Sequence, residues 1–469
     1  MSWAESAPLG ASSHPVVRAL VAELGRDAVT VDPATLAVHA VDASGAGAGV
    51  APLALVVPPS TEQVAAVAAI ASAHGVPLVP QGARTGLAGG AAAVEGSILL
   101  SLTAMAEVLA LDTVDQVAVV QAGVVTADLA TLVGRNGLFY APDPASAQWS
   151  TLGGNVATNA GGMRCVKYGV TRNAVRSLEL VLMDGTVVRT GTSTMKGVAG
   201  LDLTGLVVGS EGTLAVVTEM TLGLLPAPGP VRGVCATFPS TTAALAAVLA
   251  LLASSRRPCT LELLDAIVLA AIAAHDPDAG LPSGAEAMLL VLTDSAHGGE
   301  HDVASYAAVC RQHGALSVDV AADPERVEVL LRARRAFNPA MRSLRGASLN
   351  EDVAVPVSRI PELLERLDDL SRQVGLPIGS GGHVGDGNLH PVIAYDPDDP
   401  DQVTAAHAAH EAVLALAVEL GGTVTGEHGI GLEKRAALDL ELGPALRTVQ
   451  RGIKAVLDPA GLLNPGKKL

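Results

Sequence analysis

Two histidines on either side of a short glycine-rich stretch are the residues best suited to chemistry. His383 and His390 flank Gly385–Asn388 (GDGN), a composition that opposes helix formation and favours a tight turn. We therefore expect the two imidazoles on opposite arms of a hairpin, where they can converge. Together with the carboxylate of Glu427, later in the chain, they suit a divalent cation with open coordination positions. A pair of hydrogen-bonded structural histidines fits the same spacing, and the residues alone leave both interpretations open.

Three glycine-rich stretches in the first half of the chain are candidates for holding a polar ligand. Gln81–Gly90 lets successive backbone N–H groups turn toward a phosphate without Cβ clashes. Its spacing matches neither the dinucleotide fingerprint nor the Walker loop, so an ordinary tight turn is the alternative. Thr151–Gly162 offers many donors and little side-chain volume, which suits a bound polar ligand; a solvent-exposed irregular loop is the alternative. Val207–Leu214 is expected to be a strand followed by a glycine turn.

Regular elements must position these stretches. An apolar strand at Ala54–Val57, a helix capped at Ser60 or Thr61 and a strand at Val76–Pro80 predict a β–α–β unit. This unit leads directly into the first glycine-rich stretch. Its helix carries an apolar stripe at helical spacing, formed by Val64, Val67, Ala68 and Ala71.

The second half of the chain has a different pattern. Pro226–Pro230 is rich in proline and indicates a domain boundary. Beyond it, apolar helices alternate with short strands such as Met288–Leu292, which indicates an α+β domain. The apolar run Ala243–Ala253 is about half of the roughly 20 residues that a membrane-spanning helix needs, so we expect a buried helix there.

The composition of the 469-residue chain excludes several classes of protein. Asp and Glu (47) exceed Lys and Arg (30), and the net charge of −17 argues against nucleic-acid binding. The four cysteines are scattered without a CxxC pair, so we expect neither a disulfide framework nor a cysteine-bound iron–sulfur cluster. This usage fits a reducing cytoplasmic compartment, and residues 1–10 lack the pattern of a secretory signal. A peripheral location at the inner face of the membrane stays open.

Seven short motifs occur in an order that resembles one family. They are PQGARTGLAGG (80–90), PDPAS (142–146), TLGGNVATNAGG (151–162), VGSEGTL (208–214), GGHVGDGNLH (381–390), GEHGIG (426–431) and LLNPGK (462–467). The sequence is similar to the vanillyl-alcohol-oxidase superfamily of FAD flavoproteins. Within it, the chain resembles the branch of D-lactate dehydrogenases, glycolate oxidase flavin subunits and D-2-hydroxyglutarate dehydrogenases. The resemblance spans about residues 53–467.

This resemblance implies an α+β fold with three parts. A PCMH-type FAD-binding domain of two subdomains is expected over residues 1–226. An α+β cap domain that forms the substrate and metal sites is expected over residues 227–434. The C-terminal segment, residues 435–469, is expected to return to the FAD domain.

The resemblance also implies how FAD is bound. The first loop has no His or Cys over residues 81–85, so we expect FAD to be held without a covalent bond. Arg84 is either an ion-pair partner of the diphosphate or a solvated side chain. The residues expected at the cofactor are Pro80, Gln81, Gly82, Ala83, Arg84, Thr85, Gly86, Pro142, Ser146, Gly153, Gly154, Asn155, Thr158, Asn159, Gly161, Gly162, Glu211, Gly212 and Asn464.

For the reaction, the resemblance implies His383, His390 and Glu427 as metal ligands and His428 as the catalytic base. Zn, Mn and Fe(II) all accept this ligand set. Arg334 and Asn388 are expected at the substrate carboxylate, for which a guanidinium is well suited. His428 would remove the hydroxyl proton of a metal-bound 2-hydroxy acid while hydride passes to flavin N5. The segment Glu262–Asp265 matches the family as well, and burial or helix capping explains it.

One departure bears on the substrate. D-2-hydroxyglutarate dehydrogenases place a Lys shortly before an Asp-x-x-x-Pro element, and here Asn350 precedes Asp352–Pro356 instead. Without that cation, and with Glu351 nearby, a second substrate carboxylate is disfavoured. D-lactate, glycolate or a longer D-2-hydroxy acid is therefore expected.

The chain brings no second redox centre, so an external electron acceptor is expected: an electron-transfer flavoprotein, a quinone or an iron–sulfur partner. The sequence leaves a homodimer open. Other interpretations also stay open: a flavin oxidase that uses oxygen, a glycolate-oxidase-type subunit that acts only within a complex, a D-2-hydroxyglutarate dehydrogenase, and a metallohydrolase that uses the histidines and Glu427 alone.

Overall fold

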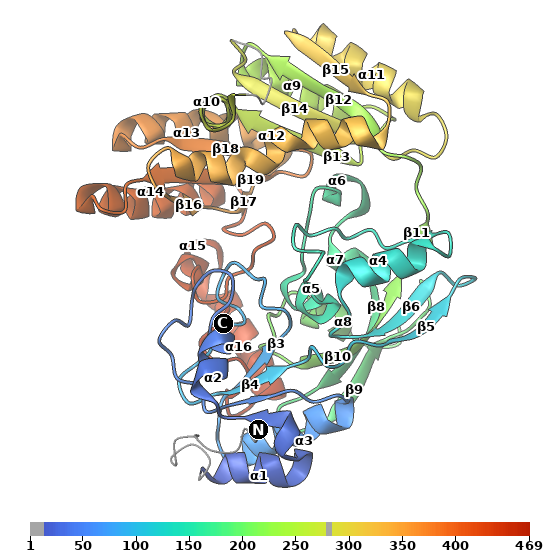
Figure 1. Ribbon diagram of the computed structural model, residues 1–469, viewed down its shortest axis with the longest axis vertical. Coiled ribbons are helices and arrows are strands. Elements are labelled where there is room, and N and C mark those ends of the chain that lie inside the picture. Colours follow the sequence, from blue (N-terminus) through green and yellow to red (C-terminus); the bar gives the residue numbers. More distant parts are fainter. Residues whose placement is uncertain (1–13, 278–283) are drawn as a thin grey trace, which may run out of the picture. The chain divides into compact units, whose positions relative to one another are not determined.

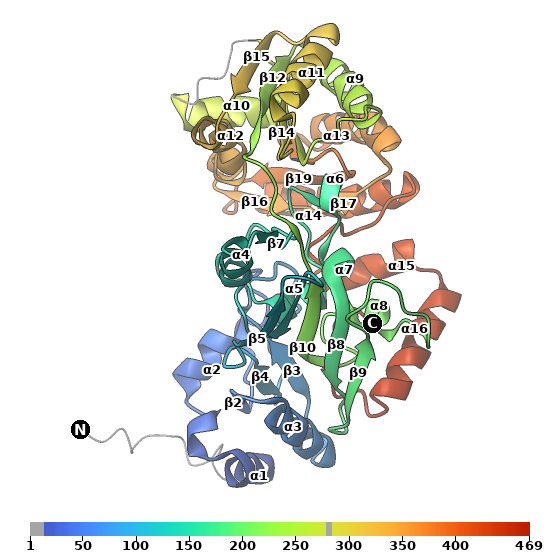
Figure 2. The ribbon, with the colours of Figure 1, turned by 90° about the vertical axis from the view of Figure 1, so that its right-hand side faces the viewer.

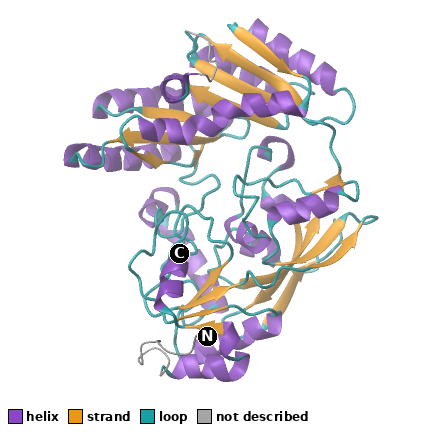
Figure 3. Ribbon diagram, in the orientation of Figure 1, coloured by secondary structure: helices purple, strands orange, loops and turns teal. Residues whose placement is uncertain are grey.

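The computed structural model describes residues 14–277 and 284–469. Residues 1–10, where the sequence lacks a signal pattern, lie outside the described part. Within it, the chain forms two compact units. Unit 1 contains the chain up to Ala160, Val170–Ala227 and Glu427–Leu469, whereas unit 2 contains Gly161–Gly169 and Pro228–Gly426. Each unit mixes helices and strands, as Figure 3 shows, in agreement with the α+β prediction. The family-based division at residues 226 and 434 remains a prediction.

Unit 1 is built on two main sheets (Figure 1). The first has the strand order β1-β2-β4-β3, with strands Val29–Thr30, Ala54–Val56, Leu78–Gln81 and Ile98–Ser101 for β1 to β4. The second has the order β5-β6-β10-β8-β9, with strands Val108–Asp112 (β5), Val117–Gln121 (β6), Val175–Val181 (β8), Val187–Gly191 (β9) and Val216–Gly223 (β10). A small third sheet pairs β7 (Leu138–Phe139) with β11 (Leu225–Pro226).

Helices join the two main sheets of unit 1 into one core. The helices of unit 1 are α1 (Pro15–Leu24), α2 (Pro33–Ala40), α3 (Thr61–Ala73), α4 (Thr126–Gly134), α5 (Leu152–Thr158), α7 (Thr171–Ala174), α8 (Leu203–Val207), α15 (Leu438–Glu441) and α16 (Pro444–Leu457), and α1, α3, α4, α5 and α8 contribute to this core. Ser60 caps α3, and the predicted stripe of this helix is buried. The core includes Val64 of α3, Ile98 of β4 and Met220 of β10, so it contains side chains of both sheets. The predicted β–α–β unit exists, but β4 lies between β2 and β3 and pairs in parallel with both.

Unit 2 is one antiparallel sheet with helices on both faces (Figure 2). Its strand order is β15-β12-β14-β13-β18-β19-β16, and β17 also pairs with β19. The strands are Arg232–Phe238 (β12), Thr260–Asp265 (β13), Ala287–Thr293 (β14), Ser317–Ala321 (β15), Ala347–Asn350 (β16), Val353–Ala354 (β17), Ile378–His383 (β18) and Asn388–Tyr395 (β19). The helices are α6 (Cys165–Tyr168), α9 (Thr241–Leu252), α10 (Ala266–His275), α11 (Gly299–Gln312), α12 (Pro324–Ser343), α13 (Ile360–Val374) and α14 (Pro400–Glu419).

Two helices of unit 2 matter most for the site. In α10 and α12, Val268, Phe337 and Met341 pack with Val392 of β19 in one buried cluster. This packing supports the strand pair β18 and β19, which carries His383 and His390. The apolar run expected to be a buried helix forms α9, capped by Ser240. In the described part of the chain, no helix is both long and apolar enough to cross a membrane.

One local expectation was wrong, and one alternative is excluded. Val207 does not lie in a strand but ends helix α8, whose cap is Asp202. Thr151–Gly162 is not a solvent-exposed irregular loop, because Thr151 caps the short helix α5 and Leu152, Gly153, Asn155 and Val156 are buried. Gly153 lies so close to Ala122 that a Cβ would come within 2.7 Å of the alanine Cβ. Small residues therefore pack here because the helix approaches the neighbouring backbone closely.

Candidate active site

The histidine hairpin forms as predicted. Strands β18 and β19 pair antiparallel, with Gly381 opposite His390 and His383 opposite Asn388. Gly387 in the turn has φ +93°, and an added Cβ would overlap the carbonyl oxygen of Val355, so glycine is required there. The two imidazole rings meet edge to face, with centroids 5.4 Å apart. The hairpin thus brings the two histidines together.

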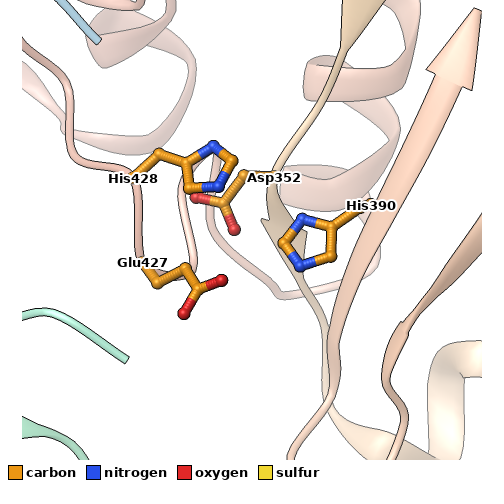
Figure 4. Close-up of side chains that lie close together, drawn as sticks. All are labelled: Asp352, His390, Glu427 and His428. Carbon is orange, nitrogen blue, oxygen red and sulfur yellow. The ribbon is translucent and has the colours of Figure 1, made fainter. Parts of the chain in front are cut away.

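Four side chains with metal-ligating atoms lie close together (Figure 4). One ligating atom from each of Asp352, His390, Glu427 and His428 lies within 4.8 Å of the others. Asp352 and His390 are buried, whereas Glu427 and His428 are half-buried. This group contains the expected His390, Glu427 and His428, but His383 is not part of it. Asp352 was not among the predicted site residues.

Asp352 also organises the backbone around this group. Its Oδ1 accepts a hydrogen bond from Nδ2 of Asn388 (2.7 Å), and its Oδ2 accepts one from Oγ1 of Thr425 (2.9 Å). At Gly426 an added Cβ would overlap Nδ2 of Asn388 and lie 2.9 Å from Oδ1 of Asp352. The segment that leads into Glu427 and His428 is thus held directly against strand β19.

His383 faces a carboxylate instead. Its Nδ1 lies 2.5 Å from Oε1 of Glu262, and Oε2 of the same carboxylate accepts a hydrogen bond from Nε of Arg334 at 2.7 Å. Burial alone would raise the pKa of Glu262, but His383 and Arg334 lower it to about 2. Burial or capping is therefore an incomplete explanation of Glu262, although Asp265, three residues on, does cap α10.

The two residues expected at the substrate lie in different surroundings. The side chain of Arg334 is 18% exposed, in contrast to Arg332, Arg335 and Arg342 of the same helix, which are exposed. The amide of Asn388 is buried and donates to Asp352 and to the carbonyl of Val353. Arg334 thus keeps some access to solvent, whereas the Nδ2 group of Asn388 is engaged by the protein.

The charge environment near Asn350 differs from the expectation. Glu351 is buried and its Oε1 pairs with Nδ1 of His410 on α14. Its negative charge therefore has a partner within the protein. Asn350 is exposed, and its amide lies 3.4 Å from Oδ1 of Asn338. Of the two residues expected to disfavour a second substrate carboxylate, only Asn350 therefore keeps that role.

The first glycine-rich loop offers a row of free donors. In the described part of the chain, no protein acceptor receives a hydrogen bond from the backbone N–H groups of Gly82–Leu87. Gln81 donates its amide to the carbonyls of His39 and Ala91, while its buried Oε1 has no partner. Arg84, at φ +58°, donates to the carbonyl of Val38. The guanidinium is thus bound to the backbone rather than free in solvent.

The second glycine-rich stretch lies against the first. A Cβ at Gly82 would overlap Oγ1 of Thr151, the cap of α5. Asn155 is buried and donates to Oγ1 of Thr126 at 2.7 Å, and Thr158 donates to the carbonyl of Gly154. Asn159 ends α5 at φ +54° and accepts the backbone N–H of Arg172. The remaining predicted residues of this part are the buried Pro142, the half-buried Ser146, and Gly161 and Gly162, which begin the unit 2 segment.

Glu211 and Asn464 connect the C-terminal part of unit 1, Glu427–Leu469, with the earlier parts of the same unit. The carboxylate of Glu211 accepts the backbone N–H groups of Ile430 (2.9 Å) and Gly431 (2.7 Å). Asn464 donates to the carbonyls of Gly90 and Glu211, and its buried Oδ1 has no partner. Gly212, at φ +69°, packs against Pro80. Most of the predicted cofactor residues therefore meet in unit 1, around the first loop.

These features fit the two groups that the family implies. The unused N–H row of Gly82–Leu87 and the unpaired oxygens of Gln81 and Asn464 suit a phosphate-containing ligand with polar edges. The two imidazoles and two carboxylates of the side-chain group suit Zn, Mn or Fe(II).

Comparisons with known proteins agree with this arrangement. Residues 52–191 match the family model described as FAD binding domain, and residues 228–468 match FAD linked oxidases, C-terminal domain. The chain is 39% identical to glycolate oxidase subunit GlcD of Bacillus subtilis over 417 residues, 89% of this chain and 88% of that one. It is 36% identical to D-lactate dehydrogenase of Anaerostipes hadrus over 424 residues, 89% of each chain.

Solved structures show the same fold at low sequence identity. Alkyldihydroxyacetonephosphate synthase superposes with a TM-score of 0.76 at 19% identity, covering 97% of this chain and 86% of that one. Substrate-bound p-cresol methylhydroxylase does so with a TM-score of 0.76 at 20% identity, covering 96% of each chain. Both likenesses concern the fold alone. From the two family models and the close relatives it follows that this chain is an FAD-binding oxidoreductase of the FAD-linked oxidase family, with the PCMH-type fold of the vanillyl-alcohol-oxidase superfamily.

Proposed function

We propose that the protein is an FAD- and divalent-metal-dependent dehydrogenase that oxidises a D-2-hydroxy monocarboxylic acid to its 2-oxo acid. The observation that carries the proposal is the group of Asp352, His390, Glu427 and His428, whose ligating atoms lie within 4.8 Å of one another and could hold a cation beside a base. The names of the relatives, glycolate oxidase subunit and D-lactate dehydrogenase, favour small acids of this class.

Residues of unit 1 would hold the cofactor. The N–H row of Gly82–Leu87 suits the diphosphate, and the free oxygens of Gln81 and Asn464 offer acceptors for polar groups of the ligand. The other predicted contacts of FAD are carried over as part of this proposal, except for the carboxylate of Glu211, which accepts the N–H groups of Ile430 and Gly431. When bound, FAD supplies a two-electron acceptor for hydride, and a divalent cation supplies a Lewis acid for the substrate hydroxyl.

Two side chains would act directly on the substrate, three more would hold the cation, and Asn388 would support one of the three. Arg334 binds the α-carboxylate through its guanidinium, a pairing that can be bidentate. An imidazole nitrogen of His428 removes the proton of the α-hydroxyl, since histidine is a base near neutral pH. His390 and Glu427 serve as metal ligands. Asp352 joins them as a further carboxylate, and Asn388 contributes by fixing Asp352 at 2.7 Å.

His383 lies outside this group of four side chains. We keep it as a metal ligand, through Nε2, since its Nδ1 faces Glu262 and its ring contacts that of His390. His428 keeps the role of base rather than ligand because Asp352, His390 and Glu427 already provide three donors. With His383 as the fourth donor, a six-coordinate cation such as Mn²⁺ would keep two positions open for the substrate.

A second candidate function is that of a flavin subunit that works only within a multi-subunit complex. The name glycolate oxidase subunit of the Bacillus subtilis relative favours it. In either case electrons must leave through an external acceptor, for which we propose an electron-transfer flavoprotein, a quinone or an iron–sulfur protein. The two candidates differ in whether the isolated chain is reduced by substrate and reoxidised by an artificial dye.

The test is a spectroscopic titration. The purified protein, loaded with FAD and Mn²⁺ under nitrogen, is mixed with D- and L-lactate, glycolate and D-2-hydroxyglutarate. Bleaching of the flavin bands by a D-monocarboxylate, lost after metal removal with a chelator, supports the proposal. Bands that none of these acids bleaches would overturn the proposed substrate class. The variant His428→Ala should slow bleaching by several orders of magnitude, whereas His407→Ala, at an exposed position of α14, should not.

A further inference from the structure

One buried carboxylate contacts two residues of the proposed site at the same time. Glu262 lies on the central strand β13, and it is 2% exposed. Its Oε1 lies 2.5 Å from Nδ1 of His383, and its Oε2 lies 2.7 Å from Nε of Arg334. His383 comes from β18, 121 positions from Glu262 in the sequence, and Arg334 comes from α12, 72 positions from it. Each oxygen has its own partner, as a buried carboxylate requires.

The contact with His383 determines which ring nitrogen carries the proton. An ionised carboxylate can only accept hydrogen bonds, so the nitrogen that faces it must be the donor. In its neutral form, which a metal ligand requires, His383 is therefore the Nδ1–H tautomer, and its Nε2 keeps a lone pair. An imidazole that donates one N–H to a carboxylate is a more basic and better oriented metal ligand. The edge-to-face contact of this ring with His390, at 5.4 Å, connects it with the candidate metal group.

The contact with Arg334 determines which edge of the guanidinium stays available. Nε is used by Glu262, so the Nη1 and Nη2 groups remain for another anion. The guanidinium also lies over the ring of Phe337, 5.6 Å from its centroid. The plane of the guanidinium is thus held from two directions. Its free edge has the fork geometry that pairs with a carboxylate.

From these contacts we propose that Glu262 is a positioning residue with two functions. It holds His383 with Nε2 directed to the cation, and it holds Arg334 with its Nη edge directed to the α-carboxylate of the substrate. Metal binding and carboxylate recognition therefore depend on the same side chain. This inference rests on the proposed function, because it assigns a common support to two of its residues.

The variant Glu262→Gln tests the proposal. Glutamine has one acceptor oxygen, so it cannot accept from both partners and its NH₂ group opposes one of the donors. We expect the Kd for Mn²⁺ and the KM for D-lactate to rise together by about 10- to 100-fold, as for other residues that support metal ligands. The rate of flavin reduction at saturating metal and substrate should fall much less. The matched control is Asp302→Asn, which changes another buried carboxylate of unit 2 that pairs with an arginine, Arg256.

Several outcomes would overturn the proposal. If Glu262→Gln changes neither the Mn²⁺ affinity nor the KM, or if Asp302→Asn changes them as much, Glu262 has no specific positioning role. If Glu262→Gln does not fold, Glu262→Asp is used, because the shorter carboxylate cannot reach both partners. Independently, ¹⁵N NMR of the metal-free wild type must show His383 as the Nδ1–H tautomer, and the Nε2–H tautomer would contradict the proposal.

The failure of this inference can be told apart from failure of the proposed function. If the wild type binds no Mn²⁺ and no 2-hydroxy acid bleaches its flavin, the proposed function is wrong. If the wild type does both and only the Glu262 variants behave as the control does, the proposed function stands and the positioning role is wrong.

Discussion

The carboxylate of Glu211 accepts the backbone N–H of Gly431 at 2.7 Å, although the two residues are 220 positions apart in the sequence. Glu211 also accepts the N–H of Ile430, and Lys468 lies 3.1 Å from its Oε1. It therefore fixes the backbone two and three residues after His428. The sequence resemblance implied a contact of Glu211 with FAD, whereas these bonds give the residue a role in holding the segment that carries the proposed base.

Replacing this carboxylate should separate cofactor binding from catalysis. In Glu211→Gln the amide NH₂ faces one of the two backbone N–H groups, and an unsatisfied buried donor costs about 1–3 kcal/mol. We expect FAD content to stay near that of the wild type while flavin reduction slows about tenfold or more. Stopped-flow absorbance measures both. The control is Glu219→Gln, because the carboxylate of Glu219 pairs with the largely exposed Arg189. If Glu211→Gln instead loses FAD while its remaining flavin is reduced at the wild-type rate, Glu211 supports the cofactor.

Metal content should depend on the side-chain group more than on His383. In His390→Ala and Asp352→Asn we expect bound Mn²⁺ to fall below a tenth of the wild-type stoichiometry, because both residues are buried members of the group. In His383→Ala we expect weaker binding but measurable metal. Elemental analysis after dialysis against Mn²⁺ gives these values. Full occupancy in His390→Ala would remove the metal site from the proposal.

Gly426 should not tolerate a side chain. Alanine there would place Cβ onto the amide of Asn388 and close to Asp352, so the segment before Glu427 must shift. We expect Gly426→Ala to lose Mn²⁺ binding and substrate-dependent flavin reduction while unit 1 keeps FAD. Gly452→Ala, in α16 with open space around it, should instead stabilise the protein by up to about 1 kcal/mol. Thermal unfolding and the two binding assays compare the variants; normal metal binding in Gly426→Ala would contradict the close packing.

The stability of the protein should depend on pH through Lys467. This side chain is 1% exposed and donates to the carbonyl of Ala92, and burial lowers its pKa to about 8, against the raising effect of Asp42 and Glu211. Between that value and the unfolded pKa of about 10.4, the unfolded chain binds more protons, so stability rises with pH in this window. Relative to Lys467→Met, the wild type should gain up to about 3 kcal/mol of unfolding free energy from pH 7 to pH 10.

This comparison is made with denaturant unfolding at saturating FAD in both proteins. Loss of the hydrogen bond in Lys467→Met changes the unfolding free energy by the same amount at every pH. Only the difference in pH dependence between the two proteins therefore measures the titration of Lys467. Parallel curves for the two proteins would mean that Lys467 titrates normally.

Two buried thiols should resist modification. Burial raises the pKa of Cys259 to about 12 and that of Cys310 to about 11, so neither forms an appreciable thiolate at pH 8. We expect iodoacetamide to label them only after unfolding, whereas the half-buried Cys165 is labelled in the native protein. Mass spectrometry of labelled peptides checks this. Labelling of Cys259 within minutes under native conditions would contradict the packing around it.

The sequence predicted the parts of the fold that depend on local patterns. The cap of α3 at Ser60, the buried helix α9 and the hairpin of His383 and His390 follow from capping, apolar runs and turn residues within a few positions. The helix α5 was missed because its glycines and asparagines oppose helix formation locally. Its stability comes from tertiary contacts such as the packing of Gly153 on Ala122, which no local pattern contains.

The site was predicted where motifs contain its residues and missed where distant strands supply them. Asp352 was visible as the first residue of the Asp-x-x-x-Pro element, which was used only to locate Asn350. Its approach to Asn388 and Thr425 depends on the pairing of β17 with β19 and on the course of the chain after α14. Glu262 was attributed to burial or capping, because its two partners, Arg334 of α12 and His383 of β18, are far from it in the sequence.

The segment Gly161–Gly169 belongs to unit 2, although the chain on either side of it belongs to unit 1. This arrangement limits where the protein can be divided into two polypeptides. Its helix α6 is held there by Lys167 and Tyr168, both within hydrogen-bond distance of Asp294 (2.5 and 2.6 Å). A truncated protein that ends at Ala227 would retain this helix without Asp294, and it would also lose Leu463, which bridges to Leu78 of β3. Neither half of the reading frame therefore encodes a self-sufficient folding unit, and a split gene would have to supply both polypeptides together for either to reach its native state.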